Sequence, residues 1–100
     1  MLVVHLRFTT APEDRPRAPG TLLESAAEIR AMPGNIAFVA FAGPGDGTAL
    51  GMLREWQTGA DFDASRASGD FRAFGAAVRP LMIAPPSRRR FAATLLPGGG

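Results

Sequence analysis

The chain has 100 residues, enough for one domain, and its hydrophobic fraction of 46% excludes a chain that is disordered throughout. All eleven basic residues are arginines, the net charge is +2, and only residues 88–90 form a basic run, so we expect no nucleic-acid partner. There is no cysteine, which excludes disulfides, thiolate metal sites and a cysteine nucleophile and fits a cytoplasmic protein.

The first residues predict a strand that begins at once. Residues 2–8 are rich in valine, leucine and phenylalanine, which favours a strand. They are too short and too interrupted for a signal peptide or a spanning helix, so we expect no membrane partner. Alternation places Val3, His5 and Arg7 on one face and the apolar residues at even positions on the other.

A helix is predicted after a proline-rich loop over residues 9–20. Thr21 is a suitable N-cap, and Glu24 three residues later completes a capping box. The apolar residues that follow have helical spacing, so we predict a helix over 22–30 that is ended by Pro33-Gly34.

The next elements are predicted to be an antiparallel pair of strands. Residues 35–42 are continuously apolar, which indicates a buried strand. The glycine-rich residues 43–47 predict a hairpin loop, and residues 48–56 predict the returning strand.

Two more helices and a last strand complete the chain. We predict a short helix over 60–67 and a longer one over 70–82, in which Pro80 kinks the last turn or ends the helix at Arg79. The last strand is predicted over 89–96, and the glycine-rich residues 97–100 are expected to be a disordered tail.

The order β-α-β-β-α-β is that of a ferredoxin-like α+β domain, here spanning residues 1–96. The helices of such a domain cover one face of its four-stranded sheet. The other face also carries apolar residues, and a second copy packed sheet against sheet would cover them. We therefore predict a homodimer.

Six motifs follow one another with the spacing of one protein family. They lie at residues 3–8, 32–35, 54–56, 61–64, 67–74 and 88–91, and include a Pro33-Gly34 turn and a Glu55-Trp56 pair. Together they resemble the antibiotic biosynthesis monooxygenases, whose ferredoxin-like domains form dimeric α/β barrels. The resemblance implies one pocket per protomer, between sheet and helices. It also implies oxidation of a phenol, quinol or anthrone of aromatic polyketide type, with O2 as co-substrate and no cofactor.

The chain departs from the family at three polar positions. Ser65 and Asp70 stand where many members have histidine, and Met52 stands where oxygenases often have asparagine. Trp56 is retained. Related haem-degrading proteins need an asparagine on the first strand, where this chain has His5, so haem degradation is not expected.

Three residues are candidates for catalysis. Trp56 could donate its indole N–H to an oxyanion or peroxide, or could be a core anchor. His5 could transfer a proton near neutral pH, or could be a buried or interface histidine. Asp70 could act as a base, or could cap a helix.

A second set of residues is expected to bind the substrate. Arg72 or Arg79 could hold an anionic substrate, or be solvated helix residues. The remaining wall residues, which core packing would explain equally well, are Met52, Phe62, Ser65, Phe71 and Phe74. With one histidine and dispersed acids, no metal site is predicted.

Three functions are compatible with these residues. The first is a cofactor-independent monooxygenase acting on a small aromatic substrate. The second is a non-oxidative cyclase, isomerase or dehydratase using the same pocket. The third is a dimer that binds a small metabolite, or serves assembly, without catalysis.

Overall fold

One antiparallel sheet of four strands organises the molecule, in the order β2-β3-β1-β4. The strands are β1 (Leu2–Thr9), β2 (Asn35–Ala42), β3 (Ala49–Trp56) and β4 (Ser87–Ala92). This is a computed structural model, and it describes residues 1–43, 45 and 47–99. The predicted hairpin loop includes residues 44 and 46, which lie outside the described residues.

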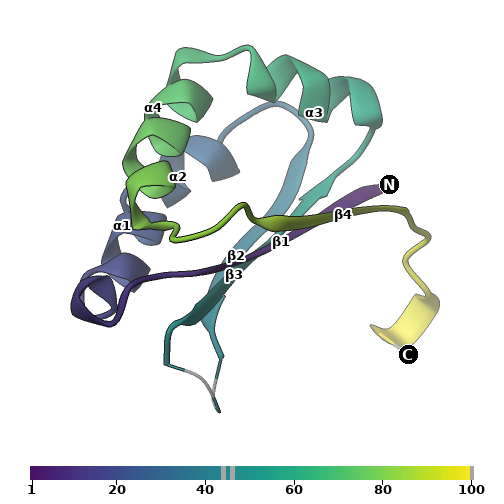
Figure 1. Ribbon diagram of the computed structural model, residues 1–100. Coiled ribbons are helices and arrows are strands. Elements are labelled where there is room, and N and C mark those ends of the chain that lie inside the picture. The colour runs from purple at the N-terminus through teal and green to yellow at the C-terminus, as the bar shows by residue number, and fades with distance from the viewer. Residues whose placement is uncertain (44, 46, 100) are drawn as a thin grey trace.

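Four α-helices pack on one side of this sheet, and Figure 1 shows no α-helix on the other side. They are α1 (Ala18–Glu24), α2 (Ala26–Arg30), α3 (Gly59–Arg66) and α4 (Gly69–Val78). Short 3-10 turns occur at Pro12–Asp14, Arg79–Leu81 and Pro97–Gly99. The predicted ferredoxin-like α+β fold is confirmed, with both of its helical segments divided in two.

The core lies between the sheet and the helices. Alternate residues of β1 and β3 point toward the helices, and β1 contributes buried Val4, Leu6 and Phe8. The helices contribute buried apolar side chains to the same cluster, among them Leu22, Ile29, Phe62, Phe74 and Val78. Each such side chain stabilises the fold by about 1.5–3 kcal/mol. The even-numbered face of the first strand is therefore its core face.

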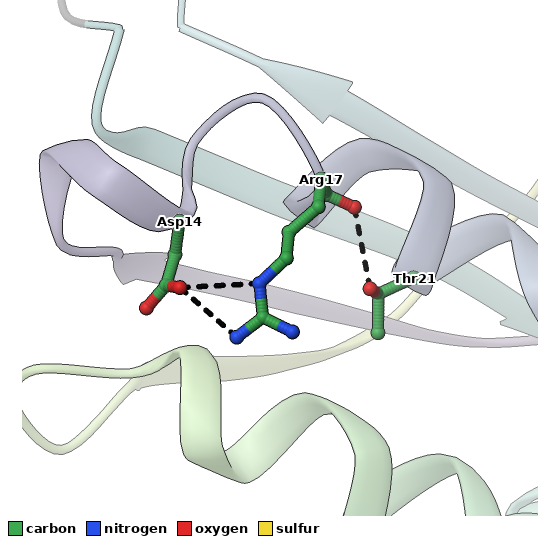
Figure 2. Close-up of polar contacts among 3 residues, drawn as sticks. All are labelled: Asp14, Arg17 and Thr21. Atoms are coloured by element: carbon green, nitrogen blue, oxygen red, sulfur yellow. Dashed lines mark hydrogen bonds and ion pairs between the residues drawn. The ribbon is translucent and has the colours of Figure 1, made fainter.

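The first helix begins earlier than predicted. Helix α1 starts at Ala18, and Thr21 lies within it rather than at its N-cap. The Thr21 hydroxyl donates to the carbonyl oxygen of Arg17 at 3.2 Å, while the Arg17 guanidinium is paired with Asp14 (Figure 2). A threonine that bonds the carbonyl four residues back is an interior helix residue. The capping-box prediction is therefore wrong, and the helix breaks instead at Ser25.

Strand β2 is half-buried in the single chain, where a buried strand was predicted. Phe38 is 1% exposed, whereas Ile36, Val39 and Phe41 are 49%, 47% and 41% exposed. Val39 and Phe41 lie on the sheet face away from the helices, because they alternate with Phe38. The continuous apolar run thus serves two faces, of which the protomer covers one.

Two boundaries near the C-terminus also differ from the predictions. Helix α4 ends at Val78, and Pro80 lies in the following 3-10 turn, because proline cannot continue the α-helical hydrogen bonds. Strand β4 spans Ser87–Ala92 instead of 89–96, since it runs antiparallel to β1 and ends where β1 begins, at the Leu2↔Ala92 pair.

Candidate functional site

A cavity of about 490 Å³ opens between α4 and the inner face of the sheet. Its walls are mostly apolar and come from β1, β3, α4 and the segment before β4. They are formed by Leu6, Met52, Arg54, Phe71, Phe74, Gly75, Val78, Arg79, Met82, Pro86 and Arg88. We call this the main cavity. Its volume lies within the range of small-molecule sites.

A smaller hollow of about 250 Å³ adjoins the main cavity. The two share Arg54, Phe71, Gly75, Arg79 and Arg88, so they are continuous. The smaller one adds Phe62, Arg66 and Arg72. Because five arginines line it, we call it the arginine hollow.

Strand β3 carries the charged residue that both spaces share. The inward positions of β3 alternate as Leu50, Met52, Arg54 and Trp56, and all four are buried. Arg54 lies opposite Val4 on β1 and Phe38 on β2, so it belongs to the middle of the sheet. Only 2% of Arg54 is exposed.

The Arg54 guanidinium has no compensating charge among the residues that the structure describes. No hydrogen bond or ion pair joins it to a described side chain or carbonyl, and its buried Nε has no partner. Its Cζ lies 5.5 Å from the ring centre of Phe62 and 5.3 Å from that of Phe71. Burial, followed by the positive charges of Arg88 and Arg66, lowers the pKa of Arg54 from 12.5 to about 10.

The other arginines of the hollow come from helices and from β4. Arg79 folds back over Gly75, where a Cβ atom would lie 2.9 Å from the guanidinium Nη2. Arg72 Nη2 donates to the carbonyl oxygen of Ala67 at 3.1 Å. Arg88 stands opposite Leu6, on the helix side of the sheet. Among the lining residues that are described, none is acidic, so the site attracts anions.

Five of the predicted site residues line these spaces. Met52 and Phe74 belong to the main cavity, Phe62 and Arg72 to the arginine hollow, and Phe71 to both. The helical stripe of α4 therefore serves the cavity as well as the core. Arg79, the other predicted anion-binding residue, also lines both spaces.

Three other candidates lie away from the cavity. His5 is on the opposite face of the sheet, beside Phe41 at a ring distance of 5.9 Å. Asp70 is exposed in the first turn of α4, and Ser68 caps that helix by accepting from the Phe71 N–H at 3.1 Å. Ser65 is buried, but its hydroxyl donates to the Phe62 carbonyl oxygen at 2.6 Å and does not line either space.

Trp56 lies one layer behind the site. It is fully buried, and its ring centre is 6.0 Å from that of Phe62, which lines the arginine hollow. Its indole N–H has no hydrogen-bond partner within the described chain. Trp56 itself does not line either space, so it supports the site through Phe62.

Sequence reasoning missed Arg54 as a site residue. The signal was present, because the alternation that buries Met52 and Trp56 also points Arg54 inward. Charged residues are normally expected at the surface, and that expectation concealed it.

Neither a cluster of metal ligands nor a membrane-spanning helix is found in the described part of the chain. No group of three or more histidine, aspartate or glutamate side chains is placed to hold a metal ion. No described helix has the length and apolar character needed to cross a membrane.

Solved structures with this fold come from distant organisms. One antibiotic biosynthesis monooxygenase is 19% identical, with a TM-score of 0.84 over 94% of this chain and 99% of that chain. Rv0793 from Mycobacterium tuberculosis is 22% identical, with a TM-score of 0.83 over 93% and 94%. A conserved protein from Methanosarcina mazei is 15% identical, with a TM-score of 0.85 over 93% and 92%. At these identities, the likeness shows a shared fold.

The family of this chain is identified by a family model that matches its sequence. No curated protein is similar enough to this chain to count as a match. The family model described as antibiotic biosynthesis monooxygenase matches residues 1–77, which is more than half of the chain. The chain therefore belongs to the antibiotic biosynthesis monooxygenase family.

Proposed function

We propose that this protein is a cofactor-independent monooxygenase that oxidises a flat phenol-, quinol- or anthrone-type molecule of aromatic polyketide origin with O2. One observation supports this proposal above the others. Arg54 is buried in the wall of an apolar cavity, and its Nε has no hydrogen-bond partner among the described residues. Such a site favours a substrate that is aromatic and becomes an anion during the reaction.

The first step of this reaction is loss of a proton from the substrate. The apolar walls hold the rings, and the positive charge of Arg54 lowers the pKa of a phenol or enol bound beside it. The described lining residues include no carboxylate and no imidazole, so solvent water takes the proton. Arg54 thus has the charge-stabilising role that the sequence had suggested for Trp56.

The electron-rich anion is then the reductant for O2. It gives one electron to O2, and the resulting radical pair combines to form a carbon–oxygen bond. Protonation yields a hydroperoxide, which eliminates water. In an anthrone, the reacting carbon loses both hydrogens and keeps one oxygen atom as a carbonyl, while the other oxygen atom leaves as water.

A homodimer joined through the open sheet face is part of the proposal. Val39, Phe41 and Phe91 lie on that face and are each about two-fifths to one-half exposed. A second copy packed against this face would bury its apolar surface, and this is the simplest way to remove that surface from water. The main cavity lies on the other side of the sheet, so dimerisation through the open face leaves the cavity accessible.

Oxygen uptake tests the activity. With an anthrone as substrate, we expect the protein to consume one O2 for each ketone formed, at a rate above the protein-free reaction. Arg54→Met should lower kcat by about a hundredfold, because it removes the charge that stabilises the anion. Arg17→Met, which removes an exposed arginine outside the site, is the matched control and should leave kcat unchanged.

The alternative is a cyclase or isomerase that stabilises the same kind of anion without oxygen chemistry. Turnover at an undiminished rate in the absence of O2 would favour it and contradict the oxygenase. Oxygen uptake that is insensitive to Arg54→Met would contradict the role of Arg54.

A further inference from the structure

We propose that the arginine hollow is a subsite for a carboxylate group carried by the aromatic substrate. This inference rests on the proposed function in that it names the substrate class of the same site. It concerns binding alone, however, and can be tested without oxidation.

The charge of the hollow is the first argument. Five of the eleven arginines in the chain line a space of about 250 Å³, although the net charge of the chain is only +2. Among its described lining residues, no aspartate or glutamate balances them. Four of the five side chains are exposed, so water screens part of their mutual repulsion, and an anion between them would remove more of it. The hollow is therefore complementary to a negative ligand group.

The burial of Arg54 is the second and independent argument. A surface arginine is solvated by water, but Arg54 is 2% exposed and its Nε has no partner. Leaving a charged group in that state is costly unless a ligand supplies the opposite charge. Arg54 lines both spaces, so its partner would be a group of the ligand bound there.

The surrounding side chains hold the guanidinium groups in place before any ligand arrives. Phe62 is approached by Arg66 at 5.6 Å and by Arg90 at 5.3 Å, in addition to Arg54. Gly75 leaves room for the Arg79 guanidinium, and the Ala67 carbonyl fixes that of Arg72. These contacts restrict the exposed arginine side chains only in part, and each restriction reduces the freedom that is lost on binding an anion.

The continuity of the two spaces identifies the ligand as a molecule with two parts. The main cavity is apolar and accepts rings, whereas the hollow accepts an anion, and the two share five lining residues. A planar carboxylate matches the planar fork of a guanidinium and can accept two parallel hydrogen bonds. An aromatic carboxylic acid is the simplest molecule that would fill both the main cavity and the arginine hollow.

Equilibrium binding under anaerobic conditions tests the subsite. Naphthoate and naphthamide have the same rings and differ only in the charge of the attached group. By titration calorimetry, we expect naphthoate to bind at least about tenfold more tightly than naphthamide, because charge-assisted hydrogen bonds are stronger than neutral ones. Arg54→Met and Arg88→Met should each lower the affinity for naphthoate by a larger factor than the affinity for naphthamide, because both side chains also line the cavity that holds the rings.

Arg89→Met is the matched control. Arg89 neighbours Arg88 on β4 but alternates to the other sheet face, opposite His5, so the preference for naphthoate should survive its replacement. Equal affinity for the acid and the amide would overturn the proposal, as would a preference that both Arg54→Met and Arg88→Met retain. Inorganic phosphate that binds as tightly as naphthoate would overturn it too, since the hollow would then take free oxyanions.

The outcome is independent of catalysis. If naphthoate binds as expected but no anthrone is oxidised, the subsite stands and the oxygenase proposal fails. If an anthrone is oxidised but the acid gains nothing over the amide, the oxygenase stands and the subsite fails.

Discussion

In the proposed reaction Arg54 stabilises a bound anion, whereas its burial destabilises the ligand-free protein. Its pKa is lowered to about 10 in the folded state. At neutral pH the charged guanidinium is therefore less stable in the folded protein than in the unfolded chain. At 1.36 kcal/mol per pKa unit, the penalty is on the order of 3 kcal/mol. Because the folded pKa is the lower one, the penalty is present at every pH below about 10.

We therefore expect Arg54→Met to stabilise the ligand-free protein by about 1–3 kcal/mol, since methionine fills a similar volume without a charge. Urea unfolding at neutral pH measures the change. Arg17→Met, at an exposed ion pair, should change stability by less than about 1 kcal/mol. A destabilised Arg54→Met protein would show that the guanidinium has a structural partner after all.

The contribution of single residues to the site was only partly readable from the sequence. Phe71, Phe74 and Met52 line the main cavity because helical and strand periodicity place them on the inner faces, and their contact with a substrate stays a prediction. The side of the sheet on which His5 lies was not readable, since alternation separates two faces without saying which one the helices cover.

Helix α4 supplies four of the eleven residues that line the main cavity, and its first turn depends on Ser68. The Ser68 hydroxyl accepts from the Phe71 N–H at 3.1 Å and donates to the Ser65 carbonyl oxygen at 2.6 Å. We expect Ser68→Ala to destabilise the protein by about 1 kcal/mol, the typical cost of a lost N-cap. Chemical denaturation measures it.

Comparison with Asp70→Ala shows whether Ser68 or Asp70 caps helix α4. Asp70 is exposed in the first turn of α4, where the helix dipole favours a negative charge, so its loss should cost about 0.5 kcal/mol or less. A larger effect for Asp70→Ala than for Ser68→Ala would contradict the capping seen in the structure.

The elements themselves followed from periodicity, whereas several of their ends did not. Helix α4 ends at Val78, one residue before the end at Arg79 that was one of two outcomes predicted for Pro80, because proline has no N–H to donate. Thr21 was misleading, since threonine can bond a carbonyl inside a helix as readily as it can cap one. The end of β4 was set by its pairing with β1, a tertiary constraint that no local pattern contains.

At the scale of the whole molecule, the open sheet face is the surface through which we expect the protein to dimerise. Val39 lies on this face in the edge strand β2, opposite Leu53 on β3, and is 47% exposed. We expect the native protein to be a dimer by light scattering and Val39→Arg to be a monomer, because the new charge would be buried between two sheets. Leu23→Arg, at an equally exposed leucine on α1, should remain dimeric. A native monomer at micromolar concentration would contradict this assembly.

Strand β4 has one further consequence, for solubility. It is an edge strand of the sheet, all six of its residues are exposed, and three of them are the consecutive Arg88, Arg89 and Arg90. Unpaired backbone groups along such an edge can recruit a strand from another molecule and begin a fibre. Three guanidinium groups on each of two approaching edges repel one another, so this arginine run also opposes the pairing of β4 with a strand of a neighbouring molecule.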